Sequence, residues 1–477
     1  MTRYFTLMAV AVAALLPGAS LAAADATTVT VGGTWGTAEE VPGIAVLDHG
    51  GSSDLLAVAC GSAGNCSAGG HYNITPGQEQ AFVVNQANGT WGTAHQVPGL
   101  AALNTGRFAG IETLSCGAAG NCAAGGFYHQ HSSSGPFQAF VVNEKRGTWG
   151  TAKEVPGLAA LNTGGGAMVL SVSCASAGNC SAGGNYATSS GSSPAFVVSE
   201  TNGTWGTAQE VPGLAALSPG QRATIFSMSC ASPGNCAAGG VYRDSVNREQ
   251  AFVVSQVNGT WGTAEQVPGT AALNPRGRAL VSSVSCPAPG RCGAGGLAGG
   301  HAYVVNETNG AWGTAEEVPG IAALNNGLPA EVDSVSCAAA GSCSAGGSYI
   351  HGAGKIELFV ATETNGTWGT AQEVPGTAAL NQGGNAELNS VSCGAAGNCG
   401  AGGFYQDGAG RLQAFVASQV NGTWHTAQRV PGIAALNPGG NSLLSSMSCA
   451  AAGNCSAGGN FAVNTAHQQA FVVSETT

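Results

Sequence analysis

Charged residues are scarce in this chain. Only 8% of its 477 residues are charged, and 14 Lys and Arg against 25 Asp and Glu give a formal net charge of −11. A protein that binds nucleic acid neutralises phosphates with clustered Lys and Arg, so we expect no nucleic-acid partner. The same shortage of cations argues against binding to an anionic membrane surface.

Long apolar runs are also missing. The sequence has no stretch of about 20 apolar residues, so we predict no membrane span. Residues 1–24 contain Arg3, an apolar run from Leu7 to Leu16, and small residues that end in Ala24. This order is typical of a secretory signal peptide. We therefore expect residues 1–24 to be removed and residues 25–477 to form one secreted, extracellular domain.

Familiar catalytic and metal-binding motifs are missing as well. The sequence contains no G-x-S-x-G, no H-E-x-x-H and no phosphate-binding glycine motif before a helix. Its nine His show no metal-ligand spacing beyond His129 and His131, which lie in a Ser-rich stretch. We assign no catalytic residue and no cofactor, and leave Ca²⁺ held by carboxylates as an open alternative.

Repetition is what the sequence has in abundance. The tryptophans recur at intervals of 51 to 58 residues, at positions 35, 91, 149, 205, 261, 312, 368 and 424. Residues 170–174 and 180–186 alternate apolar and polar or small side chains, which predicts two strands, a and b. Residues 195–199 predict strand c, Asn202-Gly203 a tight turn, and residues 205–211 strand d, which ends at Pro212. An aromatic residue near each double glycine, replaced by Leu297 in the fifth repeat, is interpreted as packing.

Four short antiparallel strands repeated eight times predict an all-β, eight-bladed β-propeller. The chain opens at residues 28–43 with the end of a c–d hairpin, and it closes at residues 443–477 with strands a, b and c. The two partial repeats together make one blade. We therefore predict that an N-terminal strand d joins the C-terminal blade and closes the ring.

The sixteen cysteines form eight C-x5-C pairs. This spacing places two sulfurs opposite each other across an a–b hairpin, whereas zinc sites favour shorter spacings, so we predict disulfides within each repeat. Disulfides agree with export to an oxidising compartment. The predicted pairs are Cys60–Cys66, Cys116–Cys122, Cys174–Cys180, Cys230–Cys236, Cys286–Cys292, Cys337–Cys343, Cys393–Cys399 and Cys449–Cys455.

Two resemblances follow from these motifs. The turn at residues 199–205 resembles the Asp-box of sialidase-type propellers, although its register differs by one residue and the Asp is absent. Residues 28–477 resemble secreted bacterial repeat proteins with S-V-S-C…G-x-C-x-A-G-G…G-T-W units. That resemblance implies a propeller, but it implies no particular activity.

The two ends of the predicted blades differ. The a–b and c–d turns hardly vary among repeats, whereas the b–c and d–a loops do, so we predict the ligand-binding face at the b–c and d–a end. Carboxylates precede several inner strands there, and Glu112 and Asp333 are expected to face each other across the ring. The predicted acidic ligand-binding residues are Glu112, Glu331, Asp333 and Glu387, with Asp54 beside them.

Arginines gather around the fourth and fifth repeats. The fifth repeat has a short b–c connection at residues 297–301, which predicts a notch between longer neighbours. Guanidinium groups suit carboxylates and sulfates, so the notch is a candidate site for an anionic sugar. The alternative is pairing of these arginines with Asp244 and Glu249. The residues concerned are Arg222, Arg243, Arg248, Arg276 and Arg278.

Three functions remain open on the sequence alone. The first is a monomeric, non-catalytic protein that binds an extracellular glycan or protein through its b–c and d–a face. The second is a polysaccharide hydrolase or lyase with a carboxylate-lined mouth, for which paired carboxyl groups about 5 to 9.5 Å apart are needed. The third is a structural or cell-surface interaction protein.

Overall fold

The computed structural model of the chain describes residues 32–49, 51–75, 77–131, 136–274, 277–352 and 354–477. These residues belong to one compact unit, Val31–Thr477. The predicted signal peptide, residues 1–24, lies outside the described residues. Among the residues described, no helix has the length and hydropathy to cross a membrane.

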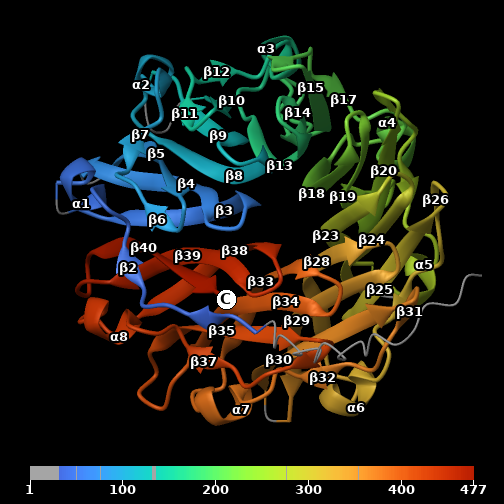
Figure 1. Cartoon of the computed structure of the whole chain (residues 1–477). Coiled ribbons are helices and arrows are strands. Elements are labelled where there is room, and N and C mark those ends of the chain that lie inside the picture. Colours follow the sequence, from blue (N-terminus) through green and yellow to red (C-terminus); the bar gives the residue numbers. More distant parts are fainter. Residues whose placement is uncertain (1–31, 50, 76, 132–135, 275–276, 353) are drawn as a thin grey trace, which may run out of the picture. The chain divides into compact units, whose positions relative to one another are not determined.

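The described chain is an eight-bladed β-propeller, as predicted (Figure 1). Each blade is an antiparallel sheet of four strands, and in the first seven blades these strands follow one another in the chain. The inner strands a are β3 (Ser53–Ser62), β8 (Ala109–Ala118), β13 (Met168–Ser176), β18 (Ala223–Ser232), β23 (Ala279–Ala288), β28 (Ala330–Ala339), β33 (Ala386–Ala395) and β38 (Ser442–Ala451). Each inner strand contacts the inner strands of both neighbouring blades, so these strands form the inner wall of a closed ring.

The middle strands b and c complete the hairpins behind each inner strand. Strands b are β4 (Asn65–Thr75), β9 (Asn121–His129), β14 (Asn179–Asn185), β19 (Asn235–Arg243), β24 (Arg291–Ala298), β29 (Ser342–His351), β34 (Asn398–Gln406) and β39 (Asn454–Ala462). Strands c are β5 (Gln78–Ala87), β10 (Phe137–Lys145), β15 (Ala195–Thr201), β20 (Glu249–Val257), β25 (His301–Thr308), β30 (Lys355–Thr364), β35 (Leu412–Val420) and β40 (Gln468–Thr476).

The outer strand d differs from the prediction because it is broken into two pieces. The first pieces are β1 (Thr34–Trp35), β6 (Thr90–Trp91), β11 (Thr148–Trp149), β16 (Thr204–Trp205), β21 (Thr260–Trp261), β26 (Ala311–Trp312), β31 (Thr367–Trp368) and β36 (Thr423–Trp424). The second pieces are β2 (Glu39–Glu40), β7 (His95–Gln96), β12 (Lys153–Glu154), β17 (Gln209–Glu210), β22 (Glu265–Gln266), β27 (Glu316–Glu317), β32 (Gln372–Glu373) and β37 (Gln428–Arg429). Between the pieces the chain turns to the previous blade, where, for example, the Ala208 N–H donates to the Pro156 carbonyl at 2.8 Å.

A one-turn helix follows each outer strand and was not predicted. In the second repeat Gly157, at φ 79°, starts helix α3 (Leu158–Leu161), and Leu158 is buried. A left-handed φ of this kind favours glycine. The others are α1 (Ile44–Leu47), α2 (Leu100–Leu103), α4 (Leu214–Leu217), α5 (Thr270–Leu273), α6 (Ile321–Asn325), α7 (Thr377–Leu380) and α8 (Ile433–Leu436).

The N-terminal segment closes the ring, as predicted. Strands β1 and β2 both pair with β40, through Trp35 opposite Glu475 and Glu40 opposite Phe471. In Figure 1 the blue β2 accordingly lies beside the red β40. The eighth blade therefore takes strands from both ends of the described chain.

All eight predicted disulfides are present, and no cysteine is free. Cys60 lies directly opposite Cys66 in the β3–β4 ladder, and the other seven pairs span the same hairpin in their own blades. Each disulfide thus ties the inner strand to the second strand of its own blade.

Hydroxyl groups on seven of the eight inner strands bind the inner strand of the next blade. In a representative pair, Ser171 and Ser173 accept hydrogen bonds from the Met228 and Cys230 N–H groups, each at 2.9 Å. The same pair of bonds recurs at six further blade interfaces. Between blades 1 and 2 the two positions are Ala57 and Ala59, which have no hydroxyl to offer.

The aromatic residues near the double glycines are buried, so the packing interpretation is confirmed. Tyr72 is 4% exposed and Tyr128 is fully buried. In the fifth blade, however, Ala298 takes this position opposite Ala279, and Leu297 occupies the neighbouring one. The fully buried Tyr303 fills the adjoining space, and its hydroxyl donates to the Leu280 carbonyl at 3.0 Å.

The two ends of the blades are arranged as predicted. The a–b and c–d turns meet within each blade, where, for example, the Gly203 N–H donates to the Gly178 carbonyl at 2.8 Å. This shared contact explains why both turns hardly vary. The b–c and d–a loops meet at the opposite end, through contacts such as the Gly106 N–H with the His129 carbonyl at 2.8 Å.

Candidate functional site

One group of interacting polar residues at the b–c and d–a end spans blades 8, 1 and 2. Asp54 begins β3, and the register of the ladder places His71 of β4 directly opposite it. The His71 Nε2 lies 3.2 Å from the Asp54 Oδ2. Gln468 of β40 donates its amide N–H to both Asp54 oxygens at 2.7 Å, and Asn460 of β39 donates to Oδ1.

These contacts fix the charge states of the pair. Burial alone would raise the pKa of Asp54, but hydrogen bonds from His71, Asn460 and Gln468 hold that pKa below its ordinary value. Burial alone would lower the pKa of His71, but Asp54 reverses this effect, and the pKa of His71 is raised. An ionised aspartate therefore holds a histidine that remains protonated at higher pH than usual.

Two further carboxyl groups lie near the pair. Burial raises the pKa of Glu79 on β5, with His71 opposing that rise and Asp54 adding to it. Burial also raises the pKa of Glu112 on β8, again opposed by His71. His71 therefore interacts with three carboxyl groups from two blades, and its protonated ring can donate hydrogen bonds while carboxylates accept them.

Aromatic rings adjoin this group on blade 2. Phe108, Phe127, His129 and Phe137 form a half-buried cluster with ring centroids 5.3 to 6.3 Å apart. A Cβ built on Gly110 would lie 3.5 Å from the Phe127 ring and 3.7 Å from the His71 side chain. Gly110 thus brings Phe127 and His71 side by side. We call Asp54, His71, Glu79, Glu112 and the four rings the acid–aromatic sector.

The acidic residues of blades 6 and 7 form a separate group. Burial, followed by the charges of Glu331 and Glu387, raises the pKa of Asp333 to about 8. The Ser348 hydroxyl donates to Asp333 at 3.3 Å and opposes the rise. Burial and Glu331 also raise the pKa of Glu387. No cation is among the groups that perturb these carboxyls, so Asp333 is largely protonated at neutral pH.

The structure therefore divides the predicted acidic residues into two groups. Glu112 interacts with His71 and Glu79, whereas Asp333 interacts with Glu331 and Glu387. Glu112 and Asp333 thus have different partners, and the expected pairing across the ring stays a prediction. Among the described residues no set of three His, Cys, Asp or Glu could hold a metal ion.

The arginines of blades 4 and 5 are mostly paired with carboxylates. Arg243 lies 3.0 Å from Glu249, and Arg278 lies 3.5 Å from the other oxygen of the same carboxylate. Arg248 lies 3.0 Å from Asp244. Arg222 is exposed, and Arg276 lies outside the described residues. These contacts match the alternative interpretation, in which the arginines pair with Asp244 and Glu249. The anionic-sugar site at this notch stays a hypothesis.

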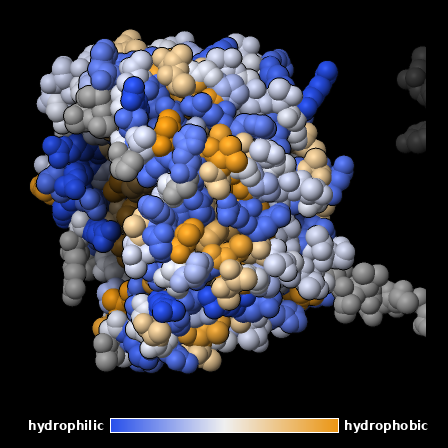
Figure 2. Space-filling view, turned by 90° about the vertical axis from the view of Figure 1, so that its left-hand side faces the viewer, coloured by the Kyte–Doolittle hydropathy of each residue, from blue (hydrophilic) through white to orange (hydrophobic). Residues whose placement is uncertain are grey.

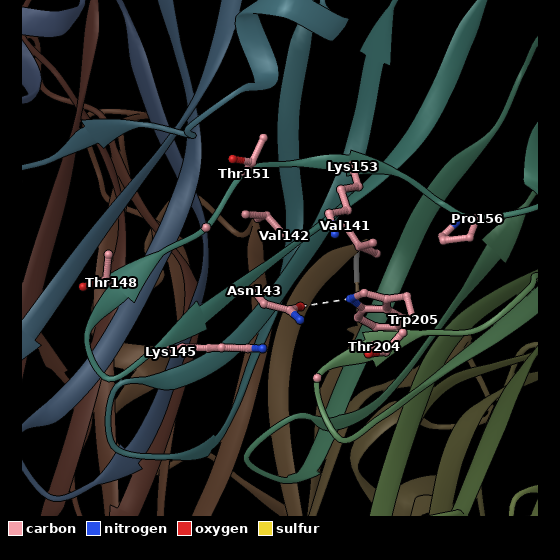
Figure 3. A pocket seen from close by; sticks show the side chains of 12 residues that line it. Val141, Val142, Asn143, Lys145, Thr148, Thr151, Lys153, Pro156, Thr204 and Trp205 are labelled. Atoms are coloured by element: carbon pink, nitrogen blue, oxygen red, sulfur yellow. Dashed lines mark hydrogen bonds between the residues drawn. The ribbon is translucent and has the colours of Figure 1, made fainter.

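Cavities also occur at the repeated end, between neighbouring blades. One of about 320 Å³ lies between blades 2 and 3, with Lys145 and Lys153 of blade 2 on one side and Trp205 of blade 3 on the other (Figure 3). The Trp205 Nε1 donates to the Asn143 Oδ1 at 2.9 Å across this interface. No site was predicted at this end from the sequence, because the a–b and c–d turns vary so little between repeats.

Sequence reasoning missed His71, Glu79, the ring cluster and the lysine cavity. For His71 the missing information was a bulge. Counting back from the Cys60–Cys66 pair along a regular ladder places Tyr72 opposite Asp54, but the register shifts between Leu55 and Ala57 and brings His71 there instead. For the rings, the run of Phe108, Phe127 and Phe137 in one repeat was a usable signal.

The chain matches no family model and no curated protein. Several solved structures are similar in fold. The Hadza microbial sialidase Hz136 is 12% identical, with a TM-score of 0.43 over 83% of this chain and 73% of that one. The Pyrococcus horikoshii acylaminoacyl peptidase is 9% identical, with a TM-score of 0.44, and its matched part is 58% of its length and 87% of this chain.

The β-propeller domain of the Trilobed protease from Pyrococcus furiosus is also similar. It is 6% identical, with a TM-score of 0.43 over 78% of this chain and 97% of that one. Identities and TM-scores this low carry no argument about ligand or activity. The functional proposals below therefore rest on this chain's own residues.

Proposed function

We propose that the chain is a secreted protein that binds a neutral or amino-sugar glycan on the acid–aromatic sector of its b–c and d–a end. The observation that carries this proposal is the juxtaposition, across Gly110, of the Asp54–His71 pair and the ring of Phe127. No other blade combines a polar pair of this kind with a cluster of rings among the residues described.

The chemistry of the sector suits a sugar. The C–H face of a pyranose packs on an aromatic ring, while its hydroxyl groups bond to carboxylate and imidazole groups placed at one edge. Asp54 and His71 are 15% and 23% exposed, so each can still reach a ligand. Three carboxyl groups against one imidazolium repel an anionic sugar, which restricts the ligand to neutral or cationic glycans.

The covalent structure supports an extracellular compartment. Eight disulfides within 477 residues require an oxidising environment to persist. Together with the predicted signal peptide this supports an extracellular location. A polysaccharide of the surrounding medium or of a cell surface is the ligand class that such a protein meets.

A matched pair of variants tests the proposal. Phe127 and Phe404 occupy the same repeat position, in blades 2 and 7, and both are half-buried. The parent is screened against immobilised glucans, mannans, galactans and chitosan. Phe127→Ala should weaken binding of the recognised polymer by about tenfold, and Phe404→Ala by less than about twofold. Failure of the parent to bind any of these polymers, or equal losses in both variants, would contradict the proposal.

A hydrolase is the second candidate, and one observation favours it. His71 with a raised pKa, held by Asp54 beside Glu112, is a non-repeated acid and base set of the kind that glycan cleavage needs. A reducing-sugar assay on the same polymers separates the two functions. Product that accumulates with the parent and is lost in Glu112→Gln assigns cleavage, whereas binding without product assigns recognition alone.

A further inference from the structure

The second blade carries three cations where the other blades carry none. Lys145 ends β10, Arg146 lies in the following turn, and Lys153 lies in β12. At the Lys145 position the other blades have Ala, Thr or Val, and at the Lys153 position they have Glu, Gln or His. The whole chain contains one more lysine, Lys355.

These cations form no ion pair with a carboxylate of the described residues, although the charge of Lys145 acts on the buried Glu200. None of the ion pairs found among the described residues includes Lys145, Arg146 or Lys153. In blades 4 and 5, by contrast, Arg243, Arg248 and Arg278 all lie beside carboxylates. In an acidic protein, three neighbouring cations without ion pairs leave a local positive charge that an anionic group can neutralise.

Backbone conformation singles out the same turn. Arg146 has φ 51°, a left-handed conformation that the c–d turns of six other blades give to Asn. Asn tolerates this region better than Arg does, so the turn bears an energetic cost to place a guanidinium here. Arg146 is the only non-Asn residue among these seven turns, and its energetic cost indicates that its charge has a function.

A cavity lies beside these cations. About 320 Å³ in volume, it lies between blades 2 and 3, and Lys145 and Lys153 line it together with Val141, Thr148, Thr204 and Trp205. Figure 3 shows the two lysines on the strands of blade 2 and Trp205 on the facing strand of blade 3. A second cavity, which Arg146 and Lys145 line together, adjoins the first at Asn143 and Gly203.

Trp205 is less buried than most of the equivalent tryptophans. Six of the eight tryptophans are only 5–8% exposed, whereas Trp205 and Trp149 are half-buried. Trp205 is held by its hydrogen bond to Asn143, and Asn143 in turn donates to the buried carboxylate of Glu200. The indole is therefore fixed in place while part of its surface stays open to the cavity.

We propose that this cavity, the blade 2–3 pocket, binds an anionic sugar residue of an extracellular polysaccharide. The carboxylate or sulfate group of the sugar pairs with Lys145 and Lys153, and the apolar face of its ring packs on Trp205. Thr148 and Thr204 offer hydroxyl groups to the remaining polar edge. The site is distinct from the acid–aromatic sector in place, since it lies at the opposite end of the blades, and in the charge it selects.

One structural role for Lys145 needs a control. Its charge also lowers the pKa of the buried Glu200, against the larger effect of burial. Another pair of neighbouring blades lacks this lysine. The fifth blade has Thr308 at the Lys145 position, and the sixth blade still has a buried glutamate, Glu363, at the Glu200 position. Lys145→Thr therefore copies an arrangement that this fold already contains, and Lys153→Gln copies Gln209 of the third blade.

The test is a titration of three soluble polymers at low and at physiological salt: oligogalacturonate, a sulfated galactan and a neutral galactan. The parent should bind one or both anionic polymers, less tightly at higher salt, and the arm that binds distinguishes carboxylate from sulfate. The double variant Lys145→Thr, Lys153→Gln should weaken that binding by about tenfold or more, and Lys355→Ala by less than about twofold. Melting curves check that both variants fold.

Three results overturn the proposal. The first is a parent that binds neither anionic polymer at low salt, and the second is a folded double variant that binds as tightly as the parent. Phe127→Ala should leave binding of the anionic polymer unchanged, because that ring belongs to the other end. Loss of anionic binding in Phe127→Ala would assign both ligands to the acid–aromatic sector and would also contradict the blade 2–3 pocket.

Discussion

Blades 1 and 7 begin their inner strands with a carboxylate at the same repeat position, but the two carboxylates differ in their surroundings. Asp54 of blade 1 faces His71 and two amide groups, and its pKa is lowered. Glu387 of blade 7 faces Phe404 and lies near Glu331, and its pKa is raised. Equivalent acidic residues therefore have hydrogen-bonding partners in blade 1, whereas in blade 7 the carboxyl group lies near another carboxyl group.

The difference shows what a ligand can use. In the acid–aromatic sector the Asp54 charge is already compensated by His71 and two amide groups, so the pair is held in place and a ligand needs only to replace water. In blades 6 and 7 the carboxyl groups repel one another and take up protons instead. Figure 2 shows a side of the molecule where apolar residues lie in small separate patches, which leaves polar chemistry to provide specificity there.

Among the substitutions considered, removal of Asp54 should destabilise the fold most. Asp54→Ala leaves the His71 imidazole and the amides of Asn460 and Gln468 without their acceptor, and should lower the free energy of unfolding by about 3 kcal/mol at neutral pH. Glu387→Ala removes the carboxyl from the equivalent position and should change it by less than about 0.5 kcal/mol. Chemical denaturation measures both, and equal losses would contradict the comparison.

Asp333 should make the fold less stable as the pH rises. Its pKa is about 8 in the fold against 3.8 as the ordinary value, so the folded state holds a proton that the unfolded chain releases. The resulting stability is fully present below pH 4 and is lost between about pH 4 and pH 8. Asp333→Asn cannot titrate, so its stability relative to the parent should rise across this interval by about 1.4 kcal/mol for each pH unit.

Melting temperatures of the parent and Asp333→Asn, measured at intervals from pH 4 to pH 8, check this prediction. A constant difference between the two proteins would mean that Asp333 titrates normally. Asp54→Asn is the comparison from the other sector. The pKa of Asp54 is lowered in the fold, so the greater stability of the parent over Asp54→Asn should be lost as the pH falls.

The smallest effect is expected at the interface between blades 1 and 2, beneath the acid–aromatic sector. Blade 6 offers Ser334 and Ser336 to the inner strand of blade 7, whereas blade 1 has Ala57 and Ala59 at these positions. Ala57→Ser with Ala59→Ser should add two hydrogen bonds and raise the free energy of unfolding by about 1 kcal/mol. Denaturation curves check this, and a loss of stability would show that the interface has no room for hydroxyls.

Much of the fold could be predicted because repetition averages out local ambiguity. Eight copies of one alternating pattern fix the strands, and the C-x5-C spacing fixes the disulfide between adjacent strands. The break in the outer strand could not be predicted, because it depends on a hydrogen bond such as that from Ala208 to Pro156 of the previous blade. The helices could have been predicted from the recurring P-G-L-A-A-L, which ends a strand and begins an apolar turn.

The sites were harder to predict because they depend on contacts between blades. Asp54 was identified from the sequence, but its partners come from β4, β39 and β40, and one β-bulge decides that His71 lies opposite. The sequence showed where the arginines gather, but their pairing with Glu249 and Asp244 was only one of two interpretations. Charge along a sequence shows where cations lie, whereas only the structure shows which of them lie beside carboxylates.

Hydrogen–deuterium exchange with and without the recognised neutral or amino-sugar glycan tests the central claim most directly, because it locates the bound ligand on the propeller. The account predicts slower exchange in β4, β9 and the start of β10, around His71, Phe127 and Phe137, with no change in β29 and β34. Protection of blades 6 and 7, or of the a–b and c–d turns in place of the acid–aromatic sector, would contradict it.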